Sequence, residues 1–132
     1  MALVIDASIA ASWMFEDEGD PRAGLVLARL RTEEAIVPSL FWFEIRNILI
    51  VSERRKRIAE ADTAGILQDL AALRIRVDHE PSDDAVMRLA RKHRLSVYDA
   101  AYLELALRTR VSLATLDAAL MQAAASESIE VI

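Results

Sequence analysis

Short apolar runs alternate with helical patterns along the whole chain, and this alternation limits the available folds more than any other feature. The first run, Leu3–Ile5, ends at Asp6, and Ala35–Val37 forms a second. Ile75–Val77 and Val111–Ala114 are predicted as two further strands. Strands separated by helices favour an α/β fold around a mainly parallel sheet.

Helical periodicity fills the intervals between these runs, and polar residues mark several of the starts. Ser39, Ser82 and Ser96 each stand where an N-cap is expected. Ile129–Ile132 is predicted as a closing strand. The predicted helices are Ala7–Phe15, Pro21–Leu30, Ser39–Arg57, Thr63–Leu73, Ser82–His93, Val97–Arg108 and Asp117–Ala124.

Length and composition predict one folded domain over residues 1–132. The hydrophobic fraction of 54% argues against disorder. No apolar run is long enough to cross a membrane, and the start of the chain lacks the basic region of a signal peptide, so we expect a cytoplasmic protein. The absence of cysteine excludes a disulfide framework and a thiolate metal site.

The net charge of −5 by itself disfavours a nucleic-acid partner, because phosphate binding requires local Lys and Arg. Cations bound at an acidic site would neutralise part of that charge. All 16 basic residues except Lys56 and Lys92 are arginine, which suits bidentate phosphate contacts. A codon bias toward Arg and Ala explains this content at least equally well, so charge leaves the partner open.

Three aspartates share one structural context. Asp6 ends the first predicted strand and Asp117 follows a later one, so both are expected at the carboxyl edge of the sheet, where open α/β sheets bind ligands. Asp99, in the first turn of a predicted helix, can point at the same crevice. Taken singly, however, each is better explained as a helix cap, and Ser96 with Asp99 matches a capping box.

Glu44 resists such an explanation. Between Ser39 and Val51 the predicted helix has only three polar residues, which predicts a helix buried nearly all round. A buried ionised Glu is costly unless it is paired, hydrogen-bonded or bound to metal. Asn47 lies one turn later on the same face, so the two side chains are predicted to form part of a site. A salt bridge to an arginine is the alternative.

The four carboxylates together are more specific than any one of them. Converging oxygen ligands without cysteine or a histidine pair suit Mg²⁺ or Mn²⁺. Two such ions are the usual device for phosphodiester hydrolysis. Without metal, the carboxylates would repel one another and raise their pKa values. The set therefore predicts a metal-dependent nuclease.

Four segments around these acids resemble the PIN-domain nucleases, and among them the VapC-type toxins of bacterial type II toxin–antitoxin pairs. The resemblance implies a three-layer α/β/α fold with a mainly parallel central sheet. It also implies a Mg²⁺- or Mn²⁺-dependent ribonuclease, for which the family suggests transfer RNA as target, together with a cognate antitoxin and a homodimer. The segments are Val4–Ser8, Val37–Asn47, Leu95–Leu103 and Leu113–Asp117, in the family's order.

The resemblance also implies roles for single residues. Asp6 and Asp99 match the central metal ligands, and Glu44 matches the acid that completes the metal sphere. Asp117 matches a fourth, more peripheral acid that often acts through water. Three further positions match polar residues that orient the acids or lie near the site: Ser8, Thr115 and Asn47.

Three other functions fit these residues less well. A catalytically idle PIN scaffold used for binding or regulation would predict a broken acid set, and none of the four acids is missing. A phosphotransfer receiver domain needs paired acids near the first strand and a late lysine, but Asp6 stands alone and no lysine follows Lys92. A nucleotide-binding Rossmann domain needs a glycine-rich loop, which three scattered glycines cannot form.

Overall fold

Four parallel strands form the centre of the computed structural model, which describes residues 1–132 except for the side chain of Glu16. The strands are β1 (Ala2–Ile5), β2 (Glu34–Pro38), β3 (Ile75–Asp78) and β4 (Ser112–Ala114). Their order in the sheet is β3-β2-β1-β4, and all pairings are parallel. Every strand predicted before the last four residues is present, and the prediction of a parallel sheet is confirmed.

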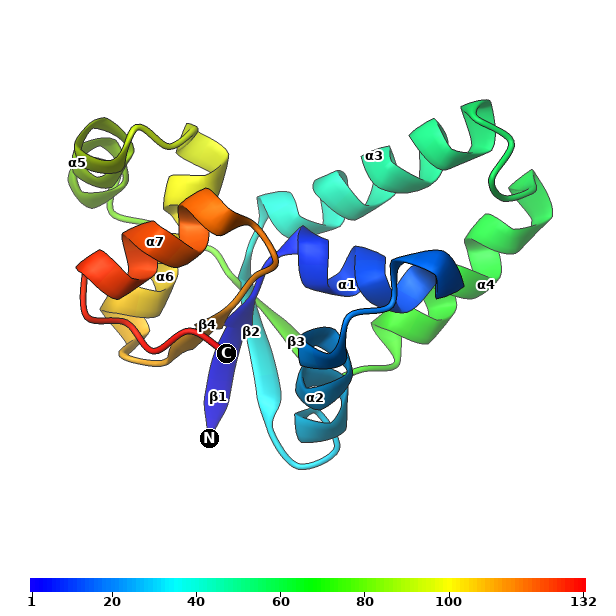
Figure 1. Ribbon diagram of the computed structural model, residues 1–132, viewed down its shortest axis with the longest axis horizontal. Coiled ribbons are helices and arrows are strands. Elements are labelled where there is room, and N and C mark those ends of the chain that lie inside the picture. The colour runs from blue at the N-terminus through cyan, green and yellow to red at the C-terminus, as the bar shows by residue number, and fades with distance from the viewer.

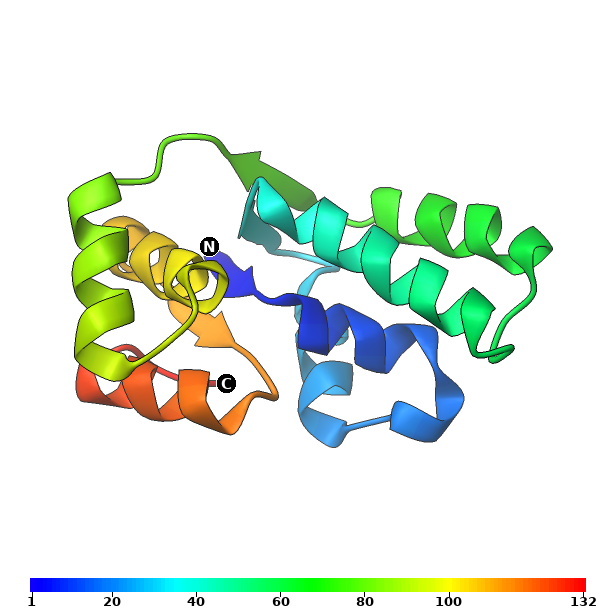
Figure 2. The same cartoon turned by 90° about the horizontal axis from the view of Figure 1, so that it is seen from above.

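Helices cover the sheet on both sides, which confirms the predicted three-layer α/β/α architecture. Figures 1 and 2 show α1 to α4 on one side of the strands and α5 to α7 on the other. Among the described residues, no helix is both long and apolar enough for a membrane crossing. The helices are α1 (Ala7–Met14), α2 (Pro21–Arg29), α3 (Leu40–Arg54), α4 (Glu60–Ala71), α5 (Asp83–His93), α6 (Val97–Thr109) and α7 (Ala118–Ser126), with a short 3₁₀ helix, η1 (Glu16–Glu18).

The core lies where the two central strands meet the helices on each face. Leu3, Val4 and Ile5 of β1 are fully buried, as expected for a parallel strand covered on both sides. Leu113 of β4 is equally buried. β1 and β2 run parallel, and each is followed directly by a helix, so α1 and α3 both begin at the carboxyl edge of the sheet (Figure 1).

The predicted closing strand at Ile129–Ile132 is wrong in extent. This segment runs beside β4, where the Leu113 N–H donates to the Glu130 carbonyl at 2.9 Å and the Ile132 N–H donates to the Leu113 carbonyl at 3.1 Å. Only one bridge, between Leu113 and Val131, results. β4 has three residues, so it offers the tail too short a partner for a regular strand.

The prediction that α3 is buried nearly all round is also wrong. Phe43 is 71% exposed and Ile50 is 41% exposed. Figure 1 shows α3 extending away from the sheet beside α4, so neighbours cover only one stripe of it. Ser39 occupies the N-cap position, but its backbone is helical and its side chain makes no capping bond. The buried stripe consists of Phe41, Ile45, Leu49 and Ser52.

Candidate active site

Asp6 follows β1 directly and caps α1, so it lies at the carboxyl edge of the sheet. Its Oδ1 accepts hydrogen bonds from the Ser8 N–H at 3.1 Å, the Ser8 hydroxyl at 2.5 Å and the Ile9 N–H at 3.3 Å. The side chain is only 5% exposed. One oxygen thus performs the whole capping role, which leaves the second oxygen for other partners.

Two hydroxyls connect Asp6 to the segment that follows β4. Thr115 Oγ1 donates to Asp6 Oδ2 at 2.5 Å and accepts from the Asp117 backbone N–H at 3.0 Å. Ser8 Oγ, which donates to Oδ1, accepts from the Leu116 N–H at 2.9 Å. Each hydroxyl gives its proton to the carboxylate and a lone pair to the backbone. The two hydroxyls therefore orient Asp6 and hold the loop that carries Asp117.

Burial raises the pKa of Asp6, and this effect outweighs the opposing hydrogen bonds from Ser8, Thr115 and Ile9. Among the described residues no lysine or arginine forms an ion pair with Asp6. Glu104 provides the contrast, since it is equally buried but pairs with Arg108 at 2.8 Å. Asp6 is thus a buried carboxyl group whose ionised form lacks the cation that such groups usually need.

Glu44 reaches the same edge from α3 and is joined there to α6. Tyr102, which is 1% exposed, donates its hydroxyl proton to Glu44 Oε1 at 2.5 Å. Burial raises the pKa of Glu44, the Tyr102 hydrogen bond opposes this, and the negative charges of Asp6 and Asp99 raise it further. Burial and the same acids raise the pKa of Tyr102 far above its usual range, so its hydroxyl stays a donor. Asp6, Glu44 and Asp99 therefore share one electrostatic environment.

Asp99 lies half-buried in the first turn of α6. The Ser96 hydroxyl accepts from the Asp99 N–H at 3.1 Å, but within the described structure the Asp99 carboxylate does not bond back to the Ser96 N–H. Burial raises the pKa of Asp99, the charge of Asp117 raises it further, and the Ser96 hydroxyl opposes the shift. The predicted capping box is only half formed, so capping does not explain this carboxylate.

Asp117 and Asn47 lie at the rim of this cluster. Asp117 is an exposed N-cap of α7, and its Oδ2 accepts from the Leu120 N–H at 2.9 Å. Its capping interpretation is therefore correct, although its charge still acts on Asp99. Asn47 is exposed on α3, one turn beyond Glu44, and the two residues border the same hollow.

The donor set fits a hard divalent cation in chemistry, although not as a closed cage. Within the described part of the chain, no three acidic or histidine side chains are close enough together to enclose an ion. Mg²⁺ usually keeps several waters and takes only one or two carboxylates directly, so a closed cage is not required. Oxygen ligands and raised pKa values together fit a hydrated cation beside Asp6, Glu44 and Asp99.

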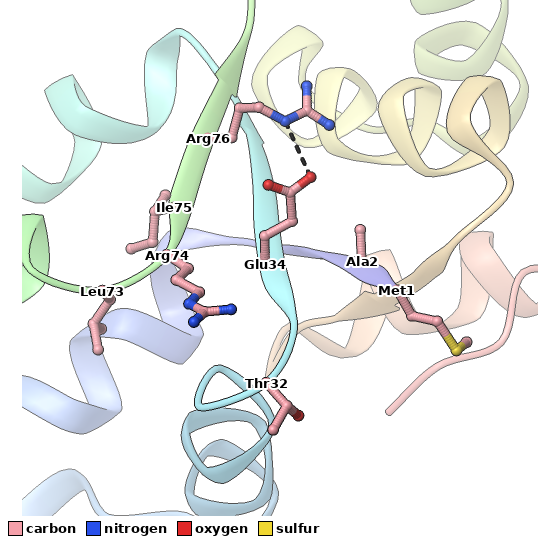
Figure 3. Close-up of a pocket in the computed structure, with 8 residues that line it drawn as sticks. All are labelled: Met1, Ala2, Thr32, Glu34, Leu73, Arg74, Ile75 and Arg76. Atoms are coloured by element: carbon pink, nitrogen blue, oxygen red, sulfur yellow. Dashed lines mark hydrogen bonds and ion pairs between the residues drawn. The ribbon is translucent and has the colours of Figure 1, made fainter.

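Two surface hollows lie at opposite ends of the sheet. A hollow of about 640 Å³ lies at the amino ends of β1, β2 and β3 and contains none of the predicted site residues. Figure 3 shows its charged groups, where Arg76 Nε donates to Glu34 Oε1 at 3.2 Å and Arg74 stands nearby. A second hollow, of about 380 Å³, borders Glu44 and Asn47 at the carboxyl edge. Of these two hollows, only the second is lined by one of the predicted site acids, Glu44.

No role was predicted for Tyr102, although the sequence carried a signal for it. Tyr102 stands three residues after Asp99 on α6, so the two side chains share a face of the helix. A tyrosine among apolar residues also needs a partner for its hydroxyl when it is buried. The partner, Glu44, is distant in sequence and could not be identified before the packing of α3 against α6 was known.

A family and a sequence relative each match most of this chain. A family described as "PIN domain" matches residues 3–126. The chain is 33% identical over 121 residues to Ribonuclease VapC3 of Pyrobaculum aerophilum, a match that covers 89% of this chain and 90% of that protein.

Two solved structures show the same fold. PAE2754 of Pyrobaculum aerophilum superposes with a TM-score of 0.74 at 22% identity, covering 93% of this chain and 84% of that one. VapC20 of Mycobacterium tuberculosis, described as a sarcin–ricin loop cleaving toxin, superposes with a TM-score of 0.61 at 15% identity. That match covers 92% of this chain and 94% of VapC20.

Proposed function

The chain belongs to the PIN-domain family, and from this premise we propose that it is a divalent-metal-dependent ribonuclease of the VapC type, the toxin of a toxin–antitoxin pair. One observation carries the proposal. Asp6, Glu44 and Asp99 meet at one edge of the sheet with raised pKa values and, among the described residues, without a paired cation. The relative named a ribonuclease supports the choice of RNA as substrate.

In this proposal Asp6, Glu44 and Asp99 hold the metal, either Mg²⁺ or Mn²⁺, and Asp117 assists from the rim through water. When bound, the cation would neutralise charge at the scissile phosphodiester and activate the attacking water. Hydrolysis then forms one bond from the water oxygen to phosphorus and breaks one P–O ester bond, and the departing oxygen takes up a proton.

The protein's contribution is to present these carboxylates in fixed orientations. Ser8 and Thr115 hold the two oxygens of Asp6 through hydrogen bonds of 2.5 Å each. Tyr102 holds one oxygen of Glu44 and, as a donor, favours the ionised form of that acid. The other Glu44 oxygen and the Asp99 carboxylate remain available to a cation. Orientation by fixed donors is what a metal site requires of its surroundings.

The proposal extends to organisation and partners. We propose that residues 1–132 act as one nuclease domain, that the protein works as a cytoplasmic homodimer, and that transfer RNA is its target, as the family suggests. A cognate antitoxin would block the acidic edge. An apolar hollow of about 340 Å³ between α1, α2 and α4, lined by Trp13, Met14 and Leu27 among others, offers such a partner an anchor.

The test is degradation of total cellular RNA by the purified protein, freed of any antitoxin, with Mg²⁺ or Mn²⁺. We expect cleavage that stops with a chelator and is abolished in Asp6→Asn. Asp84→Asn is the matched control, because it removes an exposed acid from the first turn of α5, outside the site.

Intact RNA in every sample, with folding verified by circular dichroism, would reject the nuclease in favour of an idle PIN scaffold. Equal cleavage by Asp6→Asn and wild type would reject the assigned site.

A further inference from the structure

The hollow of about 380 Å³ that borders Glu44 and Asn47 forms a groove beside the acidic edge, and Glu44 is part of its wall. Its lining comes from α1, α3 and the start of α6, including Ala7, Leu40 and Ile48. Figures 1 and 2 show the first turns of α1 and α3 close together beyond the end of β1. The volume falls within the range of small-molecule sites, roughly 300–1,000 Å³.

Two exposed aromatic side chains flank this groove. Phe43 is 71% exposed and Tyr98 is 63% exposed, and among the described residues no other aromatic side chain is classed as exposed. Phe15, Phe41 and Tyr102 are buried. The most exposed aromatic side chains of the described chain therefore lie beside the acids, where they contribute little to the hydrophobic core.

Polar groups accompany the two rings. Asn47 lies in the groove and can both donate and accept hydrogen bonds through its side-chain amide. The guanidinium carbon of Arg46 lies 4.9 Å from the centre of the Phe43 ring, which places a positive charge next to the groove. Rings, an amide and a cation are the groups with which proteins bind unpaired nucleotides.

We propose that this groove binds an unstacked base of single-stranded RNA, which stacks on Phe43 and Tyr98 while the adjoining phosphodiester lies at the acids. The proposal rests on the proposed ribonuclease function. Glu44 supports it because this residue belongs both to the groove wall and to the acidic cluster. A second copy of the chain is the alternative occupant, and the test below distinguishes it from RNA.

The test measures binding of a short single-stranded oligoribonucleotide in which 2-aminopurine, whose fluorescence falls on stacking, alternates with uridine. All proteins carry Asp99→Asn to prevent cleavage and are measured with Mg²⁺. Phe43→Leu and Tyr98→Leu remove an aromatic face but keep apolar bulk. Tyr98→Phe keeps the face, and Leu25→Ala alters an exposed apolar residue of α2 as a control.

We expect each leucine variant to weaken binding by about tenfold, which is near the lower end of the range for loss of one base–aromatic stack because leucine keeps apolar bulk, and to abolish part of the quenching. Tyr98→Phe and Leu25→Ala should bind as the parent protein does. An abasic oligonucleotide should bind the parent and the leucine variants equally, because it has no base to stack.

Leucine variants that bind and quench as the parent does would overturn the proposal, while RNA cleavage by the wild type would leave the nuclease intact. A change from dimer to monomer in the leucine variants, with RNA binding unchanged, would also overturn it and assign the groove to a second copy. A wild type that neither binds nor cleaves RNA would overturn both the groove assignment and the ribonuclease.

Discussion

Replacing Tyr102 by phenylalanine should lower the free energy of unfolding of the metal-free protein by about 1–2 kcal/mol. The change removes one oxygen from a side chain that is 1% exposed and that donates to Glu44 Oε1 at 2.5 Å. A hydrogen bond to a charged group contributes about 1.5–3 kcal/mol, and one between neutral groups about 1 kcal/mol. Glu44 is only half-buried, so water replaces part of the lost donor and the expected loss lies at the low end.

Urea unfolding followed by tryptophan fluorescence at neutral pH, with a chelator present, measures this loss. Tyr98→Phe is the matched control, because Tyr98 is 63% exposed and a surface change of this kind usually stays within about 0.5 kcal/mol. In a Glu44→Gln background the cost of Tyr102→Phe should fall to about 1 kcal/mol or less, because the acceptor is then neutral.

Two results would refute this reasoning. One is an unfolding free energy of Tyr102→Phe equal to that of the wild type. The other is a loss of the same size in both the wild-type and the Glu44→Gln backgrounds, which would mean that the Tyr102 hydroxyl acts through something other than Glu44.

Three further predictions concern single side chains. Asp99→Asn should leave the metal-free protein at least as stable as wild type. Because the folded state raises the pKa of Asp99 and so disfavours its ionised form, the gain in unfolding free energy should be absent at about pH 3 and grow as pH rises past about 4. A lower melting temperature of the variant would instead indicate a capping role. Thr115→Val should lower the free energy of unfolding in urea by about 2–3 kcal/mol, because it removes a donor from Asp6 and an acceptor from the Asp117 N–H. The control Thr32→Val, at an exposed position, should stay within about 0.5 kcal/mol of wild type. Similar values for both variants would contradict the role of the Thr115 hydroxyl. Glu104→Gln should lower the free energy of unfolding by about 2 kcal/mol, less than for a fully buried ion pair because Arg108 is one-third exposed. RNA cleavage should be unchanged. Loss of cleavage by a folded variant would place Glu104 in the site.

Much of the fold could be predicted because its elements are locally encoded. β1 and β2 are apolar runs buried on both faces, and Ser82 and Ser96 cap the helices that follow them, as expected. The burial of α3 could not be predicted from its apolar content. Exposure of Phe43 and Ile50 depends on which face of the helix its neighbours cover, and tertiary packing decides that.

The candidate site divides in the same way. That Asp6 and Asp117 lie at the carboxyl edge followed from their places after strands, but their connection through Thr115 depends on β1 and β4 being neighbours. Neighbouring strands far apart in sequence leave no periodic signal. The Tyr102–Glu44 hydrogen bond is likewise a contact between two helices that periodicity describes only one at a time.

The central claim is that the carboxylates at this edge bind a divalent cation, and titration calorimetry with Mn²⁺ tests it most directly. We predict that the wild type and Asp84→Asn bind Mn²⁺ with the same affinity, and that Asp6→Asn and Asp99→Asn each bind it at least tenfold more weakly while remaining folded. Equal Mn²⁺ affinity in all four proteins, or no binding by a wild type that still cleaves RNA, would contradict the account.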